Sequence, residues 1–408
     1  MKRLLISLLV AVGGVALAQE TLNVGLLLPF TGQYDWVGAN VQPVAQMIAD
    51  EINESGGIDG AQVRLVIGDT EGTVDAGFTA AQKLINADGV VAIVGPTSLS
   101  LAGNQQLIVD TGTPIVSPTA GTTALDAFND QYVFRTVPSD SLGGRAIARA
   151  ATDGQYLGGD AFARPVLMVA NAPAMISFQD PVAAAFEEYG TPVLANVLFT
   201  PGKTSYRTEV QEVLANDPDV IVLVATPEDS ARVMQAAFQA GYEGTWFVTQ
   251  DQTTSDYIEL ATPELVEGIY GLEEVAAPES ADLNAAFQER YKAYSGNDVQ
   301  IFGTNTYDAM NVVGLAMLRA ALRDGEVTRE TITANIRAVT DPGEGKVVVH
   351  DYTAGKEALE AGQEVDYQGL VGPIDFDRYG NITAPFAIKR VVNGEWTTVT
   401  ILPAEALD

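Results

Sequence analysis

Three hydroxyl side chains cluster where an apolar segment gives way to an amphipathic one. Thr97, Ser98 and Ser100 lie between a predicted strand at residues 90–94 and a predicted helix at residues 101–109. Hydroxyls and the free backbone N–H groups of a first helical turn can bind a carboxylate. The same residues can serve only to cap the helix, and the two interpretations are compatible because a capping turn is also an anion site. The pattern predicts contact with a ligand carboxylate.

A second polar loop follows the next predicted strand. It contains Thr119, Ala120, Gly121 and Thr122, and Asp251 occupies a similar place after a strand in the second half of the chain. Open α/β sheets bind ligands beyond the carboxyl ends of their strands. We therefore expect these residues to lie at a ligand site. For Asp251 the alternative is a solvated loop aspartate in an acidic chain.

Residues suited to catalysis or to metal binding are scarce. The sequence has one histidine, His350, and no cysteine. It also lacks a phosphate-binding glycine loop with lysine and a serine nucleophile motif. We predict a binding protein with no enzymatic activity, no metal and no cofactor, in which His350 lies at the surface.

The elements that must position these residues alternate between strands and helices. Apolar residues at helical spacing in residues 37–52 predict an amphipathic helix, which Gly56 and Gly57 end. The first series has predicted strands at residues 22–29, 63–67, 90–94 and 114–117, with helices at 75–86 and 101–109. The second has strands at 165–170, 193–199, 220–225 and 246–249, with helices at 181–189, 205–215 and 228–240. Such alternation requires right-handed crossovers, so the sequence predicts two doubly wound, Rossmann-like α/β units.

The C-terminal region follows a less regular pattern. Long helices are predicted at residues 283–295, 306–323 and 328–338. Residues 388–392 and 397–401 read as a β-hairpin, because Asn393-Gly394 between them favours a tight turn.

The N-terminus indicates export. Lys2 and Arg3 precede an apolar stretch at residues 4–17, and small residues at Ala16 and Ala18 are typical of a signal peptide cleaved after Ala18. The alternative, a membrane anchor, would need roughly 20 apolar residues. We expect the mature chain to begin at Gln19 and to diffuse in the periplasm, since no cysteine is available for a lipid anchor.

Composition restricts the partners of the mature chain. Without Lys2 and Arg3 it has 20 basic and 53 acidic residues. Such a surface repels phosphate backbones and anionic lipid, so we expect no nucleic-acid binding and no membrane-surface binding. A mature length of 390 residues exceeds what one core usually serves, which favours two lobes.

Short motifs run in order along nearly the whole mature chain, from about Leu22 to Trp396. They are Leu28-Pro29-Phe30-Thr31-Gly32, Ala49-Asp50-Glu51-Ile52-Asn53, Gly56-Gly57-Ile58-Asp59-Gly60, Asp69-Thr70, Gly95-Pro96-Thr97-Ser98, Val116-Ser117-Pro118, Phe134-Arg135-Thr136, Thr306-Tyr307-Asp308-Ala309 and Gly372-Pro373-Ile374-Asp375-Phe376-Asp377. Together they resemble the leucine/isoleucine/valine-type periplasmic solute-binding proteins of ABC transporters, which have the type I periplasmic binding fold.

The resemblance implies a domain organisation. Residues 1–18 form the signal peptide, residues 19–137 with 276–383 form lobe 1, and residues 138–275 with 384–408 form lobe 2. The chain crosses three times between the lobes through a hinge. A ligand between the lobes closes them.

The resemblance also implies roles for individual residues. Asp251 occupies the place of an acid that pairs with a ligand ammonium group, and Trp36 and Phe178 lie on loops that face the cleft. Many amino-acid-binding relatives have a hydroxyl in the place of Gly121, which glycine lacks. This departure argues against a free α-amino acid, although Thr122 is adjacent.

Two functions remain open from the sequence. In the first, the protein is a monomer that captures a branched-chain or other apolar amino acid, or a related amide or carboxylate, and delivers it to an ABC permease in the inner membrane. In the second, it is an exported sensor subunit that presents a small molecule to a membrane receptor.

Overall fold

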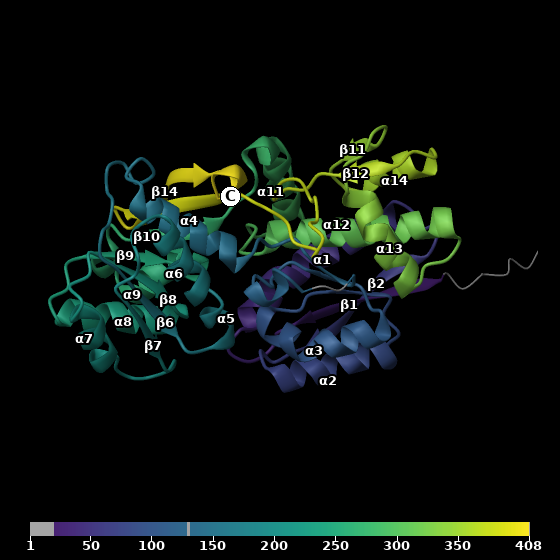
Figure 1. Ribbon diagram of the computed structural model, residues 1–408. Coiled ribbons are helices and arrows are strands. Elements are labelled where there is room, and N and C mark those ends of the chain that lie inside the picture. The colour runs from purple at the N-terminus through teal and green to yellow at the C-terminus, as the bar shows by residue number, and fades with distance from the viewer. Residues whose placement is uncertain (1–19, 129–130, 408) are drawn as a thin grey trace, which may run out of the picture.

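The computed structural model describes residues 20–128 and 131–407. Two lobes lie side by side, each built around its own β-sheet (Figure 1). The predicted signal peptide, residues 1–18, and its cleavage site after Ala18 lie outside the described residues.

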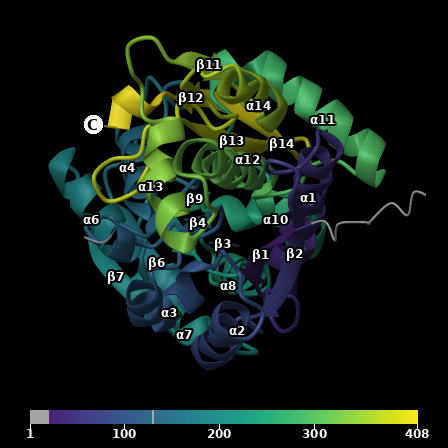
Figure 2. The ribbon, with the colours of Figure 1, turned by 90° about the vertical axis from the view of Figure 1, so that its right-hand side faces the viewer.

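The first lobe contains a parallel sheet between two layers of helices. Its described strands, in spatial order, are β2 (Gln62–Asp69), β1 (Thr21–Leu28), β3 (Ala92–Val94), β4 (Ile115–Ser117) and β5 (Val133–Arg135). Helices α2 (Val74–Asn86) and α3 (Ser98–Thr111) cover one face, and α1 (Asp35–Glu54), α11 (Ala281–Ser295), α12 (Gly303–Arg319), α13 (Arg329–Thr340) and α14 (Tyr352–Glu360) build the core on the other. Figure 2 shows this sheet between α2 and α3 on one side and α12 and α13 on the other.

The alternation of side chains along β1 produces these two cores. Leu26 and Leu28 belong to the core with α1 and α12, whereas Leu27 packs with α2 and α3. Successive side chains of a strand point to opposite faces, so an unbroken apolar run is what a sheet covered on both faces requires. A small parallel pair, β11 (Val347–Val349) and β12 (Val365–Tyr367), lies beside α14 (Figure 2).

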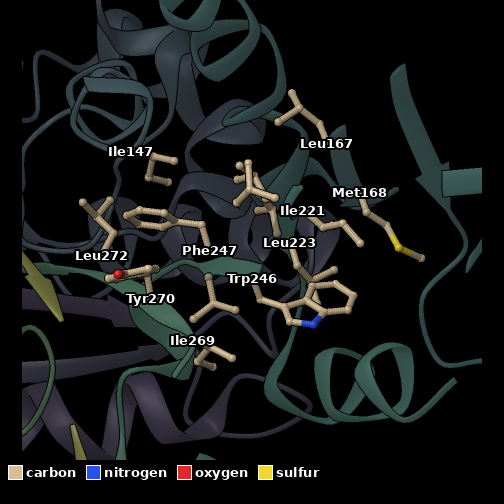
Figure 3. Packing of buried hydrophobic residues seen from close by; sticks show 14 of the residues in the cluster. Ile147, Leu167, Met168, Ile221, Leu223, Trp246, Phe247, Ile269, Tyr270 and Leu272 are labelled. Carbon is tan, nitrogen blue, oxygen red and sulfur yellow. The ribbon is translucent and has the colours of Figure 1, made fainter. Parts of the chain in front are cut away.

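The second lobe is a larger sheet of the same design with an antiparallel edge. Its described strands, in spatial order, are β14 (Glu395–Leu402), β13 (Phe386–Val392), β10 (Tyr270–Glu274), β9 (Thr245–Val248), β8 (Val220–Val224), β6 (Pro165–Ala170) and β7 (Ala195–Phe199). Its helices are α4 (Asp140–Thr152), α5 (Pro173–Ile176), α6 (Gln179–Glu188), α7 (Arg207–Leu214), α8 (Pro227–Gln239), α9 (Ser255–Ala261) and α10 (Pro263–Val266). The core side chains of its central strands pack together in Figure 3, where the rings of Phe247 and Tyr270 stack with centroids 5.9 Å apart.

The predicted fold class is confirmed. The hairpin β13–β14 turns at Asn393 and Gly394, as predicted, and both residues have positive φ, 55° and 76°, as a type I′ turn requires. The sequence patterns did not predict β5 or α4. Strand β5 has only three residues, and α4 contains Gly143 and Gly144, which weaken helix propensity, so tertiary packing decides both elements.

The chain passes three times between the two cores. Core residues of the first lobe extend to Phe134 and resume from Phe287 to Ile382. Those of the second lobe run from Ala146 to Leu272 and resume at Phe386. The crossings therefore lie after β5, after β10 and before β13.

A buried arginine holds the first crossing in place. Arg135, at the end of β5, is 1% exposed and pairs with Asp126 at 2.5 Å. Its guanidinium also donates to the carbonyl oxygens of Gly121 and Thr122, at 2.9 Å each. Asp126 in turn accepts from the hydroxyl of Ser139, next to the start of α4. The guanidinium thereby joins the loop after β4 to the beginning of the second lobe.

Replacing this arginine should destabilise the protein. Arg135→Met keeps the apolar stem but takes the guanidinium away from Asp126 and from the carbonyl oxygens of Gly121 and Thr122, and we expect a loss of about 3 kcal/mol in the free energy of unfolding. Urea titration measures it. Arg164→Met, which removes an exposed pair with Asp217, should cost less than about 1 kcal/mol. Equal losses in the two variants would contradict the role of Arg135.

Candidate ligand-binding site

A cavity of about 120 Å³ lies between the two lobes. That volume has room for roughly ten water-sized groups, the size of a small organic molecule. The carboxyl ends of β3, β4 and β5 from one lobe, and of β8, β9 and β10 from the other, lead into it. The lining residues are Tyr34, Trp36, Val37, Gly72, Thr97, Ser98, Leu99, Thr119, Gly121, Val137, Asp140, Met175, Phe178, Val224, Thr249, Gln250, Asp251, Glu274 and Phe302.

The first-lobe end of the cavity suits an anion. Thr97 and Ser98 begin α3, a helix of 14 residues, and Thr119 lies on the neighbouring loop. No side chain of the described residues caps this helix, so its first-turn N–H groups keep their donor capacity. Capping alone therefore does not explain these hydroxyls. Uncapped amides at a helix N-terminus are a site for a carboxylate.

Three carboxyl groups line the other side of the cavity. Asp140 begins α4, Asp251 follows β9, and Glu274 ends β10. Burial raises the pKa of Asp251 to about 6. Burial also raises the pKa of Asp140 to about 7, against the opposing effects of a hydrogen bond from Ser177 and of nearby Arg135. The pKa of Glu274 rises to about 8, because the group is buried and Asp140 lies close by. Desolvation dominates all three shifts, and a cation placed beside these groups would favour their ionised forms.

Gly121 makes room for one of these carboxyls. A Cβ atom at this position would overlap Oδ1 of Asp140, and the N–H group of Asp140 donates to the carbonyl oxygen of Gly121 at 2.8 Å. The missing hydroxyl at residue 121 is therefore the consequence of an acid packed against the loop. The structure thus weakens the argument from Gly121 against an amino-acid ligand.

Aromatic side chains form the apolar wall. Trp36 stacks on Phe302, with ring centroids 6.1 Å apart and an angle of 13° between the planes. Phe302 has φ of 69°, a left-handed conformation that costs energy for a non-glycine residue and is typical of functional positions. Tyr34 and Phe178 also line the cavity, and all four side chains are partly buried. The wall suits an aliphatic chain or a cation held against aromatic faces.

Three of the predicted contact residues lie outside the cavity lining. The side chain of Ser100 is fully buried and faces α2, where it fills the space beside Gly77. Ala120 is part of the core between the sheet and α3. Thr122 accepts a hydrogen bond from the N–H group of Ala124, so its hydroxyl caps a short 3-10 helix. Helix periodicity explains Ser100: two residues after Ser98 it points to a different face of α3.

The sequence analysis missed several lining residues. Asp140 and Glu274 are the most important of them, and Tyr34 and Phe302 complete the aromatic wall. A signal existed for Glu274, because it ends an apolar strand at the edge where open sheets bind ligands. No such signal existed for Phe302, which reaches the cavity from the turn before α12, remote in sequence.

The histidine, metal-binding groups and membrane-spanning helices were the subject of the remaining predictions. Nδ1 of His350 lies 2.8 Å from the carbonyl oxygen of Gln368, and the ring is half-buried rather than at the surface as predicted. Within residues 20–128 and 131–407, no group of three or more histidine and acidic side chains could hold a metal ion. No helix in the same residues is long and apolar enough to cross a bilayer.

The three raised pKa values predict a pH-dependent stability. Between pH ~4 and pH ~8 the folded protein holds more protons on these groups than the unfolded chain. Their contribution to the free energy of unfolding is complete at low pH and is lost as the pH rises through 6 to 8. We expect the urea midpoint of the ligand-free protein to fall from pH 5 to pH 8.5. Glu274→Gln, which cannot ionise, should reduce that fall, whereas Glu279→Gln at an exposed position should not. If the urea midpoint of Glu274→Gln fell with pH as much as that of the wild type, the raised pKa of Glu274 would be contradicted.

Comparison with known proteins agrees with this architecture. The family model described as "Periplasmic binding protein" matches residues 21–395. The chain is 26% identical to the chemotactic signal transduction system substrate-binding protein BasB of Halobacterium salinarum, with 88% of this chain and 84% of that protein covered. It is 24% identical to a leucine-, isoleucine-, valine-, threonine- and alanine-binding protein of Pseudomonas aeruginosa, with 80% and 86% covered. The structure of a leucine-binding protein from Thermotoga maritima superposes with a TM-score of 0.74 at 21% identity, covering 94% of this chain and 99% of that one. The chain belongs to the periplasmic binding protein family, and its two-lobed structure has the type I fold of the Thermotoga maritima protein.

Proposed function

We propose that the protein is the substrate-binding component of an ABC importer and that it captures a small molecule with both an amine and a carboxylate. The observation that carries this proposal is the arrangement of the interlobe cavity. An uncapped helix N-terminus with hydroxyls lies on one lobe, and the carboxyl groups of Asp140 and Asp251 lie on the other. A molecule with opposite charges at its two ends satisfies both sides at once.

Amino acids are the simplest ligands of this kind. The carboxylate would lie at Thr97 and Ser98, and the ammonium group at Asp140 and Asp251. Trp36 would contact the side chain. The Pseudomonas aeruginosa relative, a leucine-, isoleucine-, valine-, threonine- and alanine-binding protein, supports the assignment. The protein binds its ligand without transforming it.

Closure of the lobes would make binding selective. Three crossing segments join the two cores, so rotation of one lobe against the other bends a few residues and leaves both cores intact. The ligand stabilises the closed state because only that state surrounds it with groups from both lobes. An ABC permease would then recognise the closed form.

The proposed location is the periplasm. The family and the predicted signal peptide support export, with cleavage after Ala18 and a freely diffusing monomer. Intact-mass measurement of the secreted chain tests this, since retention of Lys2 and Arg3 would contradict the cleavage.

A role in chemotaxis is the second candidate. The Halobacterium salinarum relative, whose name assigns it to a chemotactic signal transduction system, is the observation that favours it. Deletion of the gene separates the two functions. Loss of ligand uptake indicates transport, whereas loss of the swimming response with normal uptake indicates sensing.

Charge removal at Asp251 tests the site. Asp251→Asn keeps the shape of the side chain but removes one partner of a desolvated charge pair, which typically costs about 2–5 kcal/mol, or roughly 30-fold or more in affinity. Isothermal titration with amino acids, chosen by a thermal-shift screen, measures it. Asp282→Asn at an exposed position of α11 is the matched control and should bind as the wild type does. If the wild type and Asp251→Asn bound an amine ligand with equal affinity, Asp251 would not pair with the ligand ammonium group.

The radius of gyration gives an independent test of whether the lobes close around the ligand. Small-angle scattering with saturating ligand should show a smaller radius of gyration than without ligand. A ligand that demonstrably binds without compaction would contradict the closure.

A further inference from the structure

The cavity contains more acids than the single ammonium group of a neutral amino acid can neutralise. Asp140 and Asp251 suffice for a single ammonium group, and Glu274 adds a third carboxyl group to the same lining. Its Oε2 atom is buried and has no hydrogen-bond partner among the described residues. We propose that the physiological ligand carries a net positive charge, as a basic amino acid does. This inference rests on the proposed function and specifies its ligand.

No protein cation serves the third carboxyl group. Among the described residues that line the cavity there is no lysine, arginine or histidine. Arg135, the cation that acts on Asp140, is committed to Asp126 and to backbone carbonyl oxygens. Lys389 pairs with Glu273, the neighbour of Glu274 in β10.

A charge count distinguishes the ligand classes. A neutral amino acid brings one positive and one negative charge, and the α3 N-terminus accounts for the negative one. One cationic group then faces three acids whose mutual repulsion and desolvation oppose ionisation. A second cationic group on the ligand allows Glu274 to ionise and pair with it. Burial of paired charges is tolerated, whereas burial of an unpaired one is costly.

The apolar wall is compatible with such a ligand. Trp36, Phe302 and Phe178 present aromatic surface to the cavity. Aromatic faces attract ammonium and guanidinium groups and also pack against the methylene chain between them. A long cationic side chain would therefore lie against the aromatic residues with its terminal charge directed to Glu274.

Titration calorimetry at pH 7.5 with L-arginine, putrescine and L-leucine tests the inference. Wild type should bind L-arginine at least ten-fold more tightly than L-leucine. Glu274→Gln should weaken L-arginine about 30-fold or more, because it removes one partner of a desolvated pair, and should abolish the preference over L-leucine. Putrescine has no carboxylate for the α3 N-terminus, so it should bind more weakly than L-arginine, and the reverse order would contradict the proposed function.

Glu273→Gln is the matched control. It removes the same charge one residue away, where the side chain pairs with Lys389 and does not line the cavity. A comparable loss in both variants would indicate a general charge effect and overturn the inference. Tighter binding of L-leucine than of L-arginine by wild type would overturn it too, while leaving the proposed function intact. Failure of all probes, and of the full amino-acid screen, would instead contradict the proposed function itself.

Discussion

The direction of the strands determines where this protein can hold a ligand. Parallel strands need a crossover connection, so their carboxyl ends gather at one edge of each sheet and the loops there carry free polar groups. Both sheets turn that edge toward the same cavity, which is why Thr97 and Thr119 from one lobe face Asp251 and Glu274 from the other. Each of these residues immediately follows or ends a buried strand, and the strand core fixes its position.

Desolvation of carboxyl groups connects this geometry to the proposed closure of the lobes. The surroundings of Asp140, Asp251 and Glu274 raise the pKa of each, which means that the cavity disfavours their ionised forms. Opening the lobes would return the groups to water, and a bound cation would replace that water in the closed state. The same charges that make an empty closed cavity costly thus favour closure around a positively charged group.

The carboxyl group of Asp140 packs against Gly121 and leaves no space for a side chain there. By resemblance to the family, Gly121 stands where a ligand-binding hydroxyl is expected. In the structure, the carboxyl group of Asp140 from the second lobe occupies the space that a side chain at residue 121 would fill. The guanidinium of Arg135 donates a hydrogen bond to the carbonyl oxygen of Gly121 in the same loop. At Gly121 the loop after β4 therefore contributes backbone shape, and the carboxyl group beside it comes from α4, the helix that follows the first crossing.

The sequence by itself determined the α/β class, most of the strands and helices, the β13–β14 hairpin and the family. The elements depend on local periodicity and turn chemistry, as in the apolar run of β1 and the Asn393-Gly394 turn, and the family depends on the order of short motifs. Thr97, Ser98 and Asp251 could be selected because loops after strands lie at a predictable edge. Only the tertiary structure decided that Ser100 and Ala120 face the interior and that Glu274 and Phe302 meet the cavity. Contacts between segments hundreds of residues apart depend on how two lobes pack, and short-range patterns carry no information about that packing.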